Sequence, residues 1–169
     1  MDASSLRGLQ APLKARYAES PADAMITLRA TGSVDAQSIA CKVETGPALA
    51  VAGLHPATGG TGLELCSGDM LLEALVACAG VTLKAVATAL EIPIEAGKVT
   101  AEGDLDFRGT LGVDKTARVG FAAIRLNFEI ESAASQEKLD TLLRLTERYC
   151  VVLQTLSVSP ALAVSLTRS

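Results

Sequence analysis

Histidine and tryptophan are rare or missing in this chain of 169 residues. It has one histidine, His55, no tryptophan, three phenylalanines and two tyrosines. A single histidine excludes a histidine-rich metal centre built within one chain. The four cysteines contain no Cys-x-x-Cys pair and no Cys/His ligand spacing, so we expect no bound metal. The glycines at 59–62 lack the Gly-Lys-Ser/Thr of a phosphate loop, and we predict no cofactor.

Positive charge is also sparse. Fifteen Lys and Arg stand against nineteen Asp and Glu, which gives a formal net charge of −4 with no basic block along the chain. Because phosphate binding usually leaves a clustered positive footprint, we expect no nucleic-acid partner. The most apolar stretch, residues 70–90, contains Glu73 and Lys84, which favours a buried helix over a membrane span.

The N-terminal residues indicate a compartment, which in turn predicts the state of the cysteines. Residues 1–10 have neither the cationic nor the apolar segment of a secretory signal. We therefore expect a soluble, cytoplasmic protein. In that reducing compartment the four cysteines are not expected to form structural disulfides, and a pair that does oxidise would be transient and catalytic.

The chain does contain enough apolar material for a core. Hydrophobic residues make up 49% and charged residues 20%, so the composition predicts one compact domain. Apolar residues recur at helical spacing from Leu6 to Tyr17, which predicts a short amphipathic helix. We assign residues 1–21 to an N-terminal helical extension and residues 22–169 to the main domain.

Apolar periodicity predicts the order of the elements in the main domain. Strand-like patterns occupy residues 24–30, 38–45, 48–54, 99–107 and 124–131, and a last strand after Pro160 would carry Leu162, Val164 and Leu166. A long helix at 67–90, apolar nearly all round, should be buried on several sides. Further helices are predicted at 135–149, with Leu139, Leu142, Leu143 and Thr146 inward, and at 151–157. The order βββαββαβ after a leading helix indicates an α+β domain with antiparallel sheets.

Each cysteine has a plain structural interpretation when it is taken alone. Cys41 lies on the inward face of its predicted strand, and Cys78 lies inside the long helix, so both are interpreted as small core residues. Cys66 precedes that helix in a polar, glycine-rich segment and is interpreted as a spare thiol more readily than as a redox centre. Cys150 ends a helix beside charged residues, which can perturb a thiol.

The order and spacing of two of these cysteines change the interpretation. Residues 67–78, Ser-Gly-Asp-Met-Leu-Leu-Glu-Ala-Leu-Val-Ala-Cys, resemble the long helix of the OsmC/Ohr family, the osmotically induced protein C and organic hydroperoxide resistance proteins. In that family an acidic residue opens the helix and a reactive cysteine follows, as Cys78 follows Asp69 by nine positions. The family's second cysteine ends a Leu- and Glu-rich helix, as Cys150 does 72 residues after Cys78. The glycine loop at 59–62 is also similar, and the likeness covers residues 22–168.

This resemblance implies a fold and a reaction. The implied fold is OsmC-like, with antiparallel sheets around a long central helix in an intertwined homodimer. The implied reaction is attack of the Cys78 thiolate on an organic hydroperoxide, followed by closure of a disulfide between Cys150 and the resulting sulfenic acid. An external dithiol would reduce that disulfide, and the role would be oxidative stress defence.

The resemblance also implies charged residues around Cys78. In the family an arginine from the first strand region, held by the helix's acidic residue, activates the thiol; the candidates here are Arg29 and, second, Arg16. The acidic position matches Asp69, one methylene shorter than the usual Glu, and Glu73 follows one turn later. On a straight helix Asp69 is about 180° around and roughly 13 Å along from Cys78, so an electrostatic link would run through another strand or subunit.

The effect of Val151, the role of His55 and an alternative function are considered next to this resemblance. Val151 follows Cys150 where the family often has proline. His55, in the loop before the long helix, either approaches the thiols or is a solvated loop residue. The alternative function is a non-catalytic OsmC-like dimer that binds an apolar ligand without peroxidase activity.

Overall fold

The computed structural model describes residues 2–20, 31–34, 40–45 and 48–168 of the chain. Its elements, in chain order, are α1 (Ala3–Glu19), β1 (Thr31–Val34), β2 (Ala40–Thr45), β3 (Ala48–Gly53), the 3-10 helix η2 (Pro56–Thr58), β4 (Leu65–Cys66), α2 (Ser67–Ala89), β5 (Ala96–Leu105), α3 (Phe107–Thr110), β6 (Phe121–Glu131), α4 (Gln136–Tyr149) and α5 (Val151–Ser157). The fold is α+β with antiparallel strands and a long central helix, as predicted.

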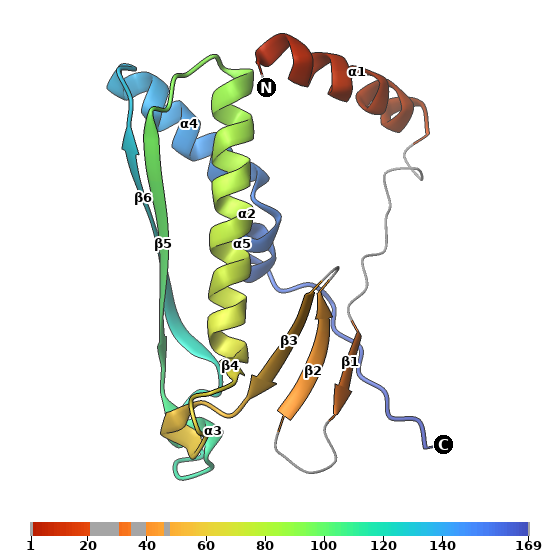
Figure 1. Cartoon of the computed structure of the whole chain (residues 1–169), viewed down its shortest axis with the longest axis vertical. Helices are drawn as coiled ribbons and strands as arrows, with labels where there is room; N and C mark the ends of the chain where they lie inside the picture. Colours follow the sequence, from red (N-terminus) through yellow and green to blue (C-terminus); the bar gives the residue numbers. More distant parts are fainter. Residues whose placement is uncertain (1, 21–30, 35–39, 46–47, 169) are drawn as a thin grey trace.

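The central element is α2, and the other parts of the fold lie along it or at its ends (Figure 1). Asp69 lies in its first turn, where a carboxylate interacts favourably with the helix dipole. The helix ends before Glu91, whose left-handed backbone, with φ of 56°, lets the Ile92 amide donate to the Ala87 carbonyl at 2.9 Å. The predicted long helix is therefore confirmed to within a residue of its ends.

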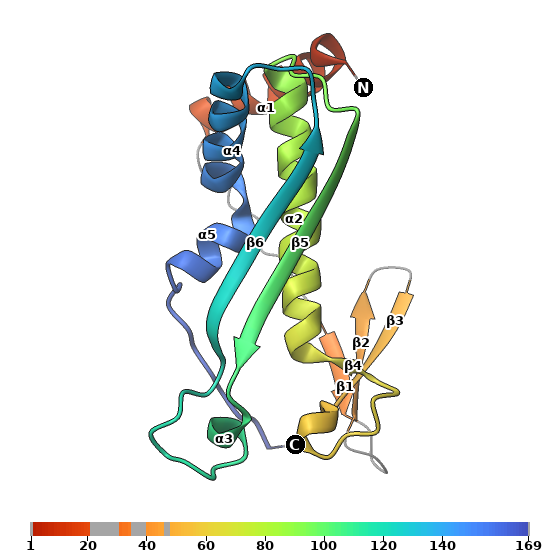
Figure 2. The ribbon, with the colours of Figure 1, turned by 90° about the vertical axis from the view of Figure 1, so that its left-hand side faces the viewer.

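The strands β5 and β6 form an antiparallel hairpin along one side of α2 (Figure 2). Their alternate apolar residues pack towards the helix, and the residues between them are exposed. On the exposed face Arg125 of β6 bonds to Glu102 and Asp104 of β5. The two strands predicted from period-two patterns in the second half of the chain are confirmed. β5 ends at Leu105, short of the predicted residue 107, because the Asp106 side chain accepts from the Arg108 amide and begins α3.

Two clusters of buried side chains join α2 to its neighbours. The first contains Leu83, Ala87, Ile92 and Leu142, and the second contains Leu75, Ala79 and Cys150. The α2 members are four residues apart and therefore form one stripe along the helix. This stripe is where β5, α4 and α5 pack.

The helix α4 buries fewer leucines than predicted. Leu142 and Thr146 are each 1% exposed, whereas Leu143 is 42% exposed. Successive helical residues are separated by about 100°, so Leu142 and Leu143 cannot both point at α2. The predicted inward position of Leu143 is thus corrected, because it lies at the edge of the contact.

The N-terminal strands form a separate four-stranded sheet in the order β1-β2-β3-β4. β1, β2 and β3 pair antiparallel, and the strands predicted at 38–45 and 48–54 are confirmed within the described residues. The two-residue β4, which no alternation predicts, pairs parallel to β3 and leads directly into α2. The strand predicted at 24–30 lies outside the described residues.

The strand predicted after Pro160 is not formed. Residues 159–168 have no helix or strand, and Leu162, Val164 and Leu166 are almost fully exposed. A strand is stable only when its amides and carbonyls pair with a neighbour. In the described part of the single chain no strand pairs with this segment, so the apolar alternation alone does not produce one.

The opposite side of α2 is uncovered. Val81 is 73% exposed, and the alanines Ala74 and Ala77 on the same side of the helix are exposed too. The predicted burial on several sides is therefore not reached within one chain. By length and composition α2 meets a criterion for a membrane span, which the core helix of a soluble protein also meets.

Candidate active site

Cys78 and Cys150, here called the thiol pair, come from different helices. Cys78 lies in the middle of α2, and Cys150 lies where α4 meets α5. The β5–β6 hairpin and α4 fold back along α2, which brings the α4–α5 junction beside the middle of that helix (Figure 2). Cys78 packs against the buried cluster that contains Cys150, and each thiol shifts the pKa of the other. Both thiols are free.

The joint between two helices holds Cys150 in place. Its extended backbone, with φ −72° and ψ 105°, ends α4 and begins α5. Its amide donates to the Thr146 carbonyl and its carbonyl accepts from the Gln154 amide, both at 2.9 Å. The side chain is 0% exposed. Cys150 is therefore fixed by main-chain bonds on both sides and directed at α2.

Hydrogen-bond donors outweigh burial at Cys78. Burial raises the pKa of this thiol, but bonds from the Val152 amide, Cys150, the Val151 amide and the Thr82 hydroxyl lower it, and the pKa lies below its usual value. Donor groups beside a sulfur stabilise the thiolate more than the thiol. Cys78 is thus the member of the pair that ionises first.

Cys150 shows the opposite behaviour. Burial raises the pKa of its thiol, the Leu153 and Val152 amides lower it, and the hydrogen bond to Cys78 and the negative charge of the Cys78 thiolate raise it. The pKa of Cys150 therefore lies above its usual value. When one thiol of the pair is ionised, the proton stays on Cys150, and a buried thiol is held next to a half-buried thiolate.

This arrangement suits oxidation at one sulfur and trapping by the other. Only the thiolate is nucleophilic, so Cys78 is the group that an oxidant would meet. A sulfenic acid formed there has Cys150 as its neighbour and can condense with it to a disulfide. The chemistry that the geometry supports is reversible thiol oxidation within one chain.

The acidic candidates lie apart from Cys78. Asp69 is exposed in the first turn of α2, and Glu73 is exposed one turn later. No bond joins either carboxylate to Cys78 in the described structure. The structure therefore does not bring the acidic position of the resemblance to the thiol pair.

The basic candidates are not placed by the structure. Arg29 lies outside the described residues, and so does the side chain of Arg16, although Arg16 belongs to α1. Among the groups that are described around the Cys78 sulfur, the donors are neutral: two backbone amides, a hydroxyl and a thiol.

His55 and Cys66 lie near the start of α2, away from the thiol pair. At the start of η2 the His55 Nδ1 accepts a hydrogen bond of 3.0 Å from the Ala57 amide. The His55 ring stacks on Phe107 with centroids 4.9 Å apart. With Cys66 and Asp69 it lines a cavity of about 380 Å³. Cys66 precedes Cys78 by twelve residues, about 18 Å along the helix, so this cavity is separate from the thiol pair.

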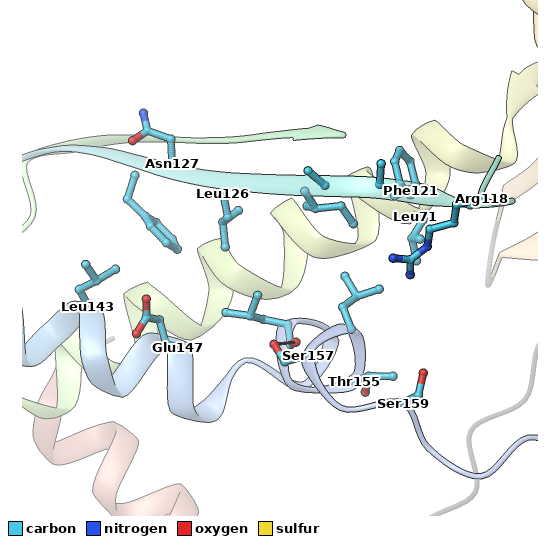
Figure 3. A pocket seen from close by; sticks show the side chains of 17 residues that line it. Leu71, Arg118, Phe121, Leu126, Asn127, Leu143, Glu147, Thr155, Ser157 and Ser159 are labelled. Atoms are coloured by element: carbon cyan, nitrogen blue, oxygen red, sulfur yellow. Dashed lines mark hydrogen bonds between the residues drawn. The ribbon is translucent and has the colours of Figure 1, made fainter. Parts of the chain in front are cut away.

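A larger cavity, of about 810 Å³, lies between β6 and the helices α4 and α5 (Figure 3). Apolar and polar side chains share its walls, and Arg118 and Glu147 lie at opposite ends of it. Neither thiol of the pair lines it. Leu126 and Leu153 line this cavity and also pack on the cluster around Cys150, so a layer of side chains separates the cavity from the thiols.

The donors at Cys78 were not among the residues predicted for the site. Thr82 could have been found from its spacing, because residues four apart in a helix lie on one face. The amides of Val151 and Val152 could have been found from the predicted helix start after Cys150, because the first amides of a helix have no partner within it. Proline has no N–H, so Val151 adds a donor where the resembled family often has none.

The family of the chain follows from the fold, the thiol pair and one comparison. A family model described as OsmC-like protein matches residues 60–165, which include both thiols and the elements that hold them. The chain belongs to the OsmC-like family. A comparison with curated proteins finds no match.

Solved structures share this fold at low sequence identity. An OsmC-like protein from Mycoplasma pneumoniae is 19% identical with a TM-score of 0.65, over 79% of this chain and 89% of that one. The organic hydroperoxide resistance protein OsmC from Legionella pneumophila is 17% identical with a TM-score of 0.60, over 78% and 90%. An organic hydroperoxide resistance protein from Elizabethkingia anophelis, with thiocyanate bound, is 16% identical with a TM-score of 0.59, over 78% and 89%. At these identities the likeness concerns the fold.

Proposed function

We propose that this protein is a thiol peroxidase that reduces organic hydroperoxides through Cys78 and Cys150. The observation that carries the proposal is the thiol pair itself, in which a thiol of lowered pKa contacts a buried thiol of raised pKa. The names of the Legionella and Elizabethkingia structures support the substrate class. A cytoplasmic setting and a role in oxidative stress defence belong to the same proposal.

The reaction would proceed in two steps that leave an oxidised chain. The Cys78 thiolate attacks the terminal peroxide oxygen, an S–O bond forms as the O–O bond breaks, and the leaving alkoxide takes a proton to become the alcohol. The Cys150 thiol then attacks the Cys78 sulfur, so that an S–S bond forms, the S–O bond breaks, and hydroxide leaves with the Cys150 proton as water. An external dithiol reduces the disulfide by thiol–disulfide exchange.

The first prediction concerns the product of one turnover. Reduced protein exposed briefly to cumene hydroperoxide is expected to form a Cys78–Cys150 disulfide, because these two sulfurs are already neighbours. Peptide mapping under non-reducing conditions, after the free thiols are alkylated, identifies the linkage. Cys66→Ser is the matched control and should give the same disulfide. A protein that keeps both thiols of the pair reduced would contradict the proposed function.

We also propose that the protein acts as a homodimer. Support comes from the uncovered face of α2, where exposed apolar and small residues lie opposite the buried stripe. A helix of this composition is more stable when that face is covered. In the proposed dimer the face would meet a second copy of the chain.

The second prediction tests this dimer. The protein should sediment at twice the 17.4 kDa of one chain, and Val81→Asp should shift it towards monomer by at least roughly tenfold in dissociation constant, since a charge would be buried in the interface. Val113→Asp is the control, because Val113 is equally exposed, at 73%, but lies in the loop after α3. A single-chain mass for the unaltered protein would refute the dimer.

A second candidate function is favoured by the larger cavity. Its volume of about 810 Å³ and the apolar side chains in its walls suit an apolar ligand, and the thiol pair lies outside it. In this function the chain is a non-catalytic OsmC-like binding protein. The disulfide mapping above separates the two functions, because a binding protein would leave Cys78 and Cys150 reduced after exposure to the hydroperoxide.

A further inference from the structure

The larger cavity follows β6 from Phe121 to Phe128 (Figure 3). At about 3.4 Å per residue, this length of strand spans about 24 Å. The cavity is therefore elongated, with Arg118 at one end and Glu147 at the other. Its volume of about 810 Å³ is typical of a small-molecule site, and its shape suits a chain-like ligand.

The uncharged polar side chains in the walls are largely engaged within the protein. Thr155 and Ser157 each donate to the main-chain carbonyl four residues earlier, at 2.8 Å, and the Asn127 amide donates to Glu129 at 3.3 Å. Because these hydrogens already have acceptors, the side chains do not require a polar ligand. The apolar side chains between the two ends include Leu126, Phe128, Leu143, Leu153 and Leu156. The body of a ligand that packs on them would be apolar.

The two charged side chains set the polarity of the cavity. Arg108 and Arg125 each pair with two carboxylates, whereas Arg118 forms no ion pair within the described part of the chain. Glu147 forms none among the described residues either. A guanidinium binds a carboxylate through two parallel N–H donors, and Glu147 repels a second anion. The cavity is thus complementary to a ligand with one anionic end.

Close backbone contacts fix the Arg118 end of the cavity. A Cβ atom on Gly109 of α3 would lie 2.6 Å from the Arg118 carbonyl oxygen, so the main chain at Arg118 packs directly on α3. A Cβ atom on Gly103 of β5 would overlap the Phe121 ring, so this ring occupies the space that a side chain would fill. This end is therefore formed before a ligand arrives, which lowers the cost of binding.

We propose that this cavity binds an amphipathic monocarboxylate, with the carboxylate at Arg118 and a single apolar chain along β6. The inference deepens the second candidate function, on which it rests, and needs no reaction at the thiol pair. Leu126 and Leu153 lie between the cavity and the cluster around Cys150. The ligand would therefore be held without contact with either sulfur.

The third prediction compares ligands by isothermal titration calorimetry of the full chain. Decanoate should bind once per chain and about fivefold more tightly than decanol, since a partly exposed ion pair contributes at most about this factor. Octanoate should bind roughly tenfold more weakly than decanoate, because two fewer methylenes are buried. Decanedioate should also bind more weakly, since its second carboxylate would lie against apolar walls or towards Glu147.

Three variants locate the ligand. Arg118→Gln should weaken decanoate about fivefold and leave decanol unchanged, so that the preference for the carboxylate disappears. Lys115→Gln is the matched control, because it removes the same charge from the same loop and Lys115 does not line the cavity. It should leave both affinities unchanged. Leu143→Asn, towards the other end of the cavity, should weaken both ligands, and circular dichroism checks that each variant is folded.

The outcomes separate this inference from both candidate functions. A preference for decanoate that is lost in Arg118→Gln and kept in Lys115→Gln supports the inference. Equal affinity for decanoate and decanol in the unaltered protein, or a preference that survives in Arg118→Gln, overturns it and leaves the binding function standing. Absence of binding for both ligands overturns the inference and the binding function together. The Cys78–Cys150 disulfide is mapped without these ligands, so the peroxidase proposal is tested separately.

Discussion

Cys78→Ser is expected to reduce hydroperoxide consumption to the rate of a protein-free solution. Loss of an attacking nucleophile typically lowers turnover by at least roughly a thousandfold. A serine hydroxyl does not ionise near neutral pH and cannot form a sulfenic acid, so both steps of the proposed reaction are lost. The measurement is consumption of cumene hydroperoxide with dithiothreitol as the reductant.

Cys150→Ser is the matched variant for this fourth prediction. It keeps the attacking thiolate and removes the resolving thiol, so without added reductant one equivalent of hydroperoxide should still be consumed, and a sulfenic acid should accumulate that dimedone labels at Cys78. Cys78→Ser loses both steps of the proposed reaction, whereas Cys150→Ser loses only the formation of the disulfide. Turnover that survives in Cys78→Ser would remove Cys78 from the mechanism.

The fifth prediction concerns stability. Leu142→Ala should lower the free energy of unfolding by about 2–5 kcal/mol, since truncation of a buried leucine loses its transfer free energy and leaves a cavity. Leu142 is 1% exposed and packs with Leu83, Ala87 and Ile92. Urea unfolding followed by circular dichroism gives the midpoint and the slope from which the difference is obtained.

Leu143→Ala is the control, because it makes the same chemical change one residue along α4. Leu143 is 42% exposed and lines the larger cavity, so its truncation should cost less than about 1 kcal/mol. A stability loss in Leu143→Ala equal to that in Leu142→Ala would contradict the packing described for α4. Both leucines were predicted to face inward, and this pair of variants tests the correction directly.

Much of the fold could be predicted because the periodicity of apolar residues reports local burial. The long helix, the β5–β6 hairpin and α4 each carry a pattern over ten or more residues, which is long enough to separate a period of 3.6 from a period of 2. The segment with Leu162, Val164 and Leu166 has an equally clear alternation and yet forms no strand. Alternation indicates which face of a strand would be buried, but a strand also needs a partner.

The site was harder to predict than the fold. The resemblance singled out Cys78 and Cys150, and the structure brings these two side chains together. Asp69 lies in the first turn of α2, nine residues before Cys78, and Arg29 is outside the described residues. The Thr82 hydroxyl and the amides of Val151 and Val152 carry no distinctive sequence signal, since every non-proline residue has an amide. These groups affect the pKa of Cys78 because the fold places them near its sulfur.

The sequence by itself determined the helix that carries Cys78, the strands that flank it and the order in which they occur. These follow from interactions between residues a few positions apart, which a single chain segment already contains. The opposite pKa shifts of the two thiols were decided by tertiary structure alone. They require the α4–α5 junction, 72 residues beyond Cys78, to place backbone donors and a buried thiol against the middle of α2.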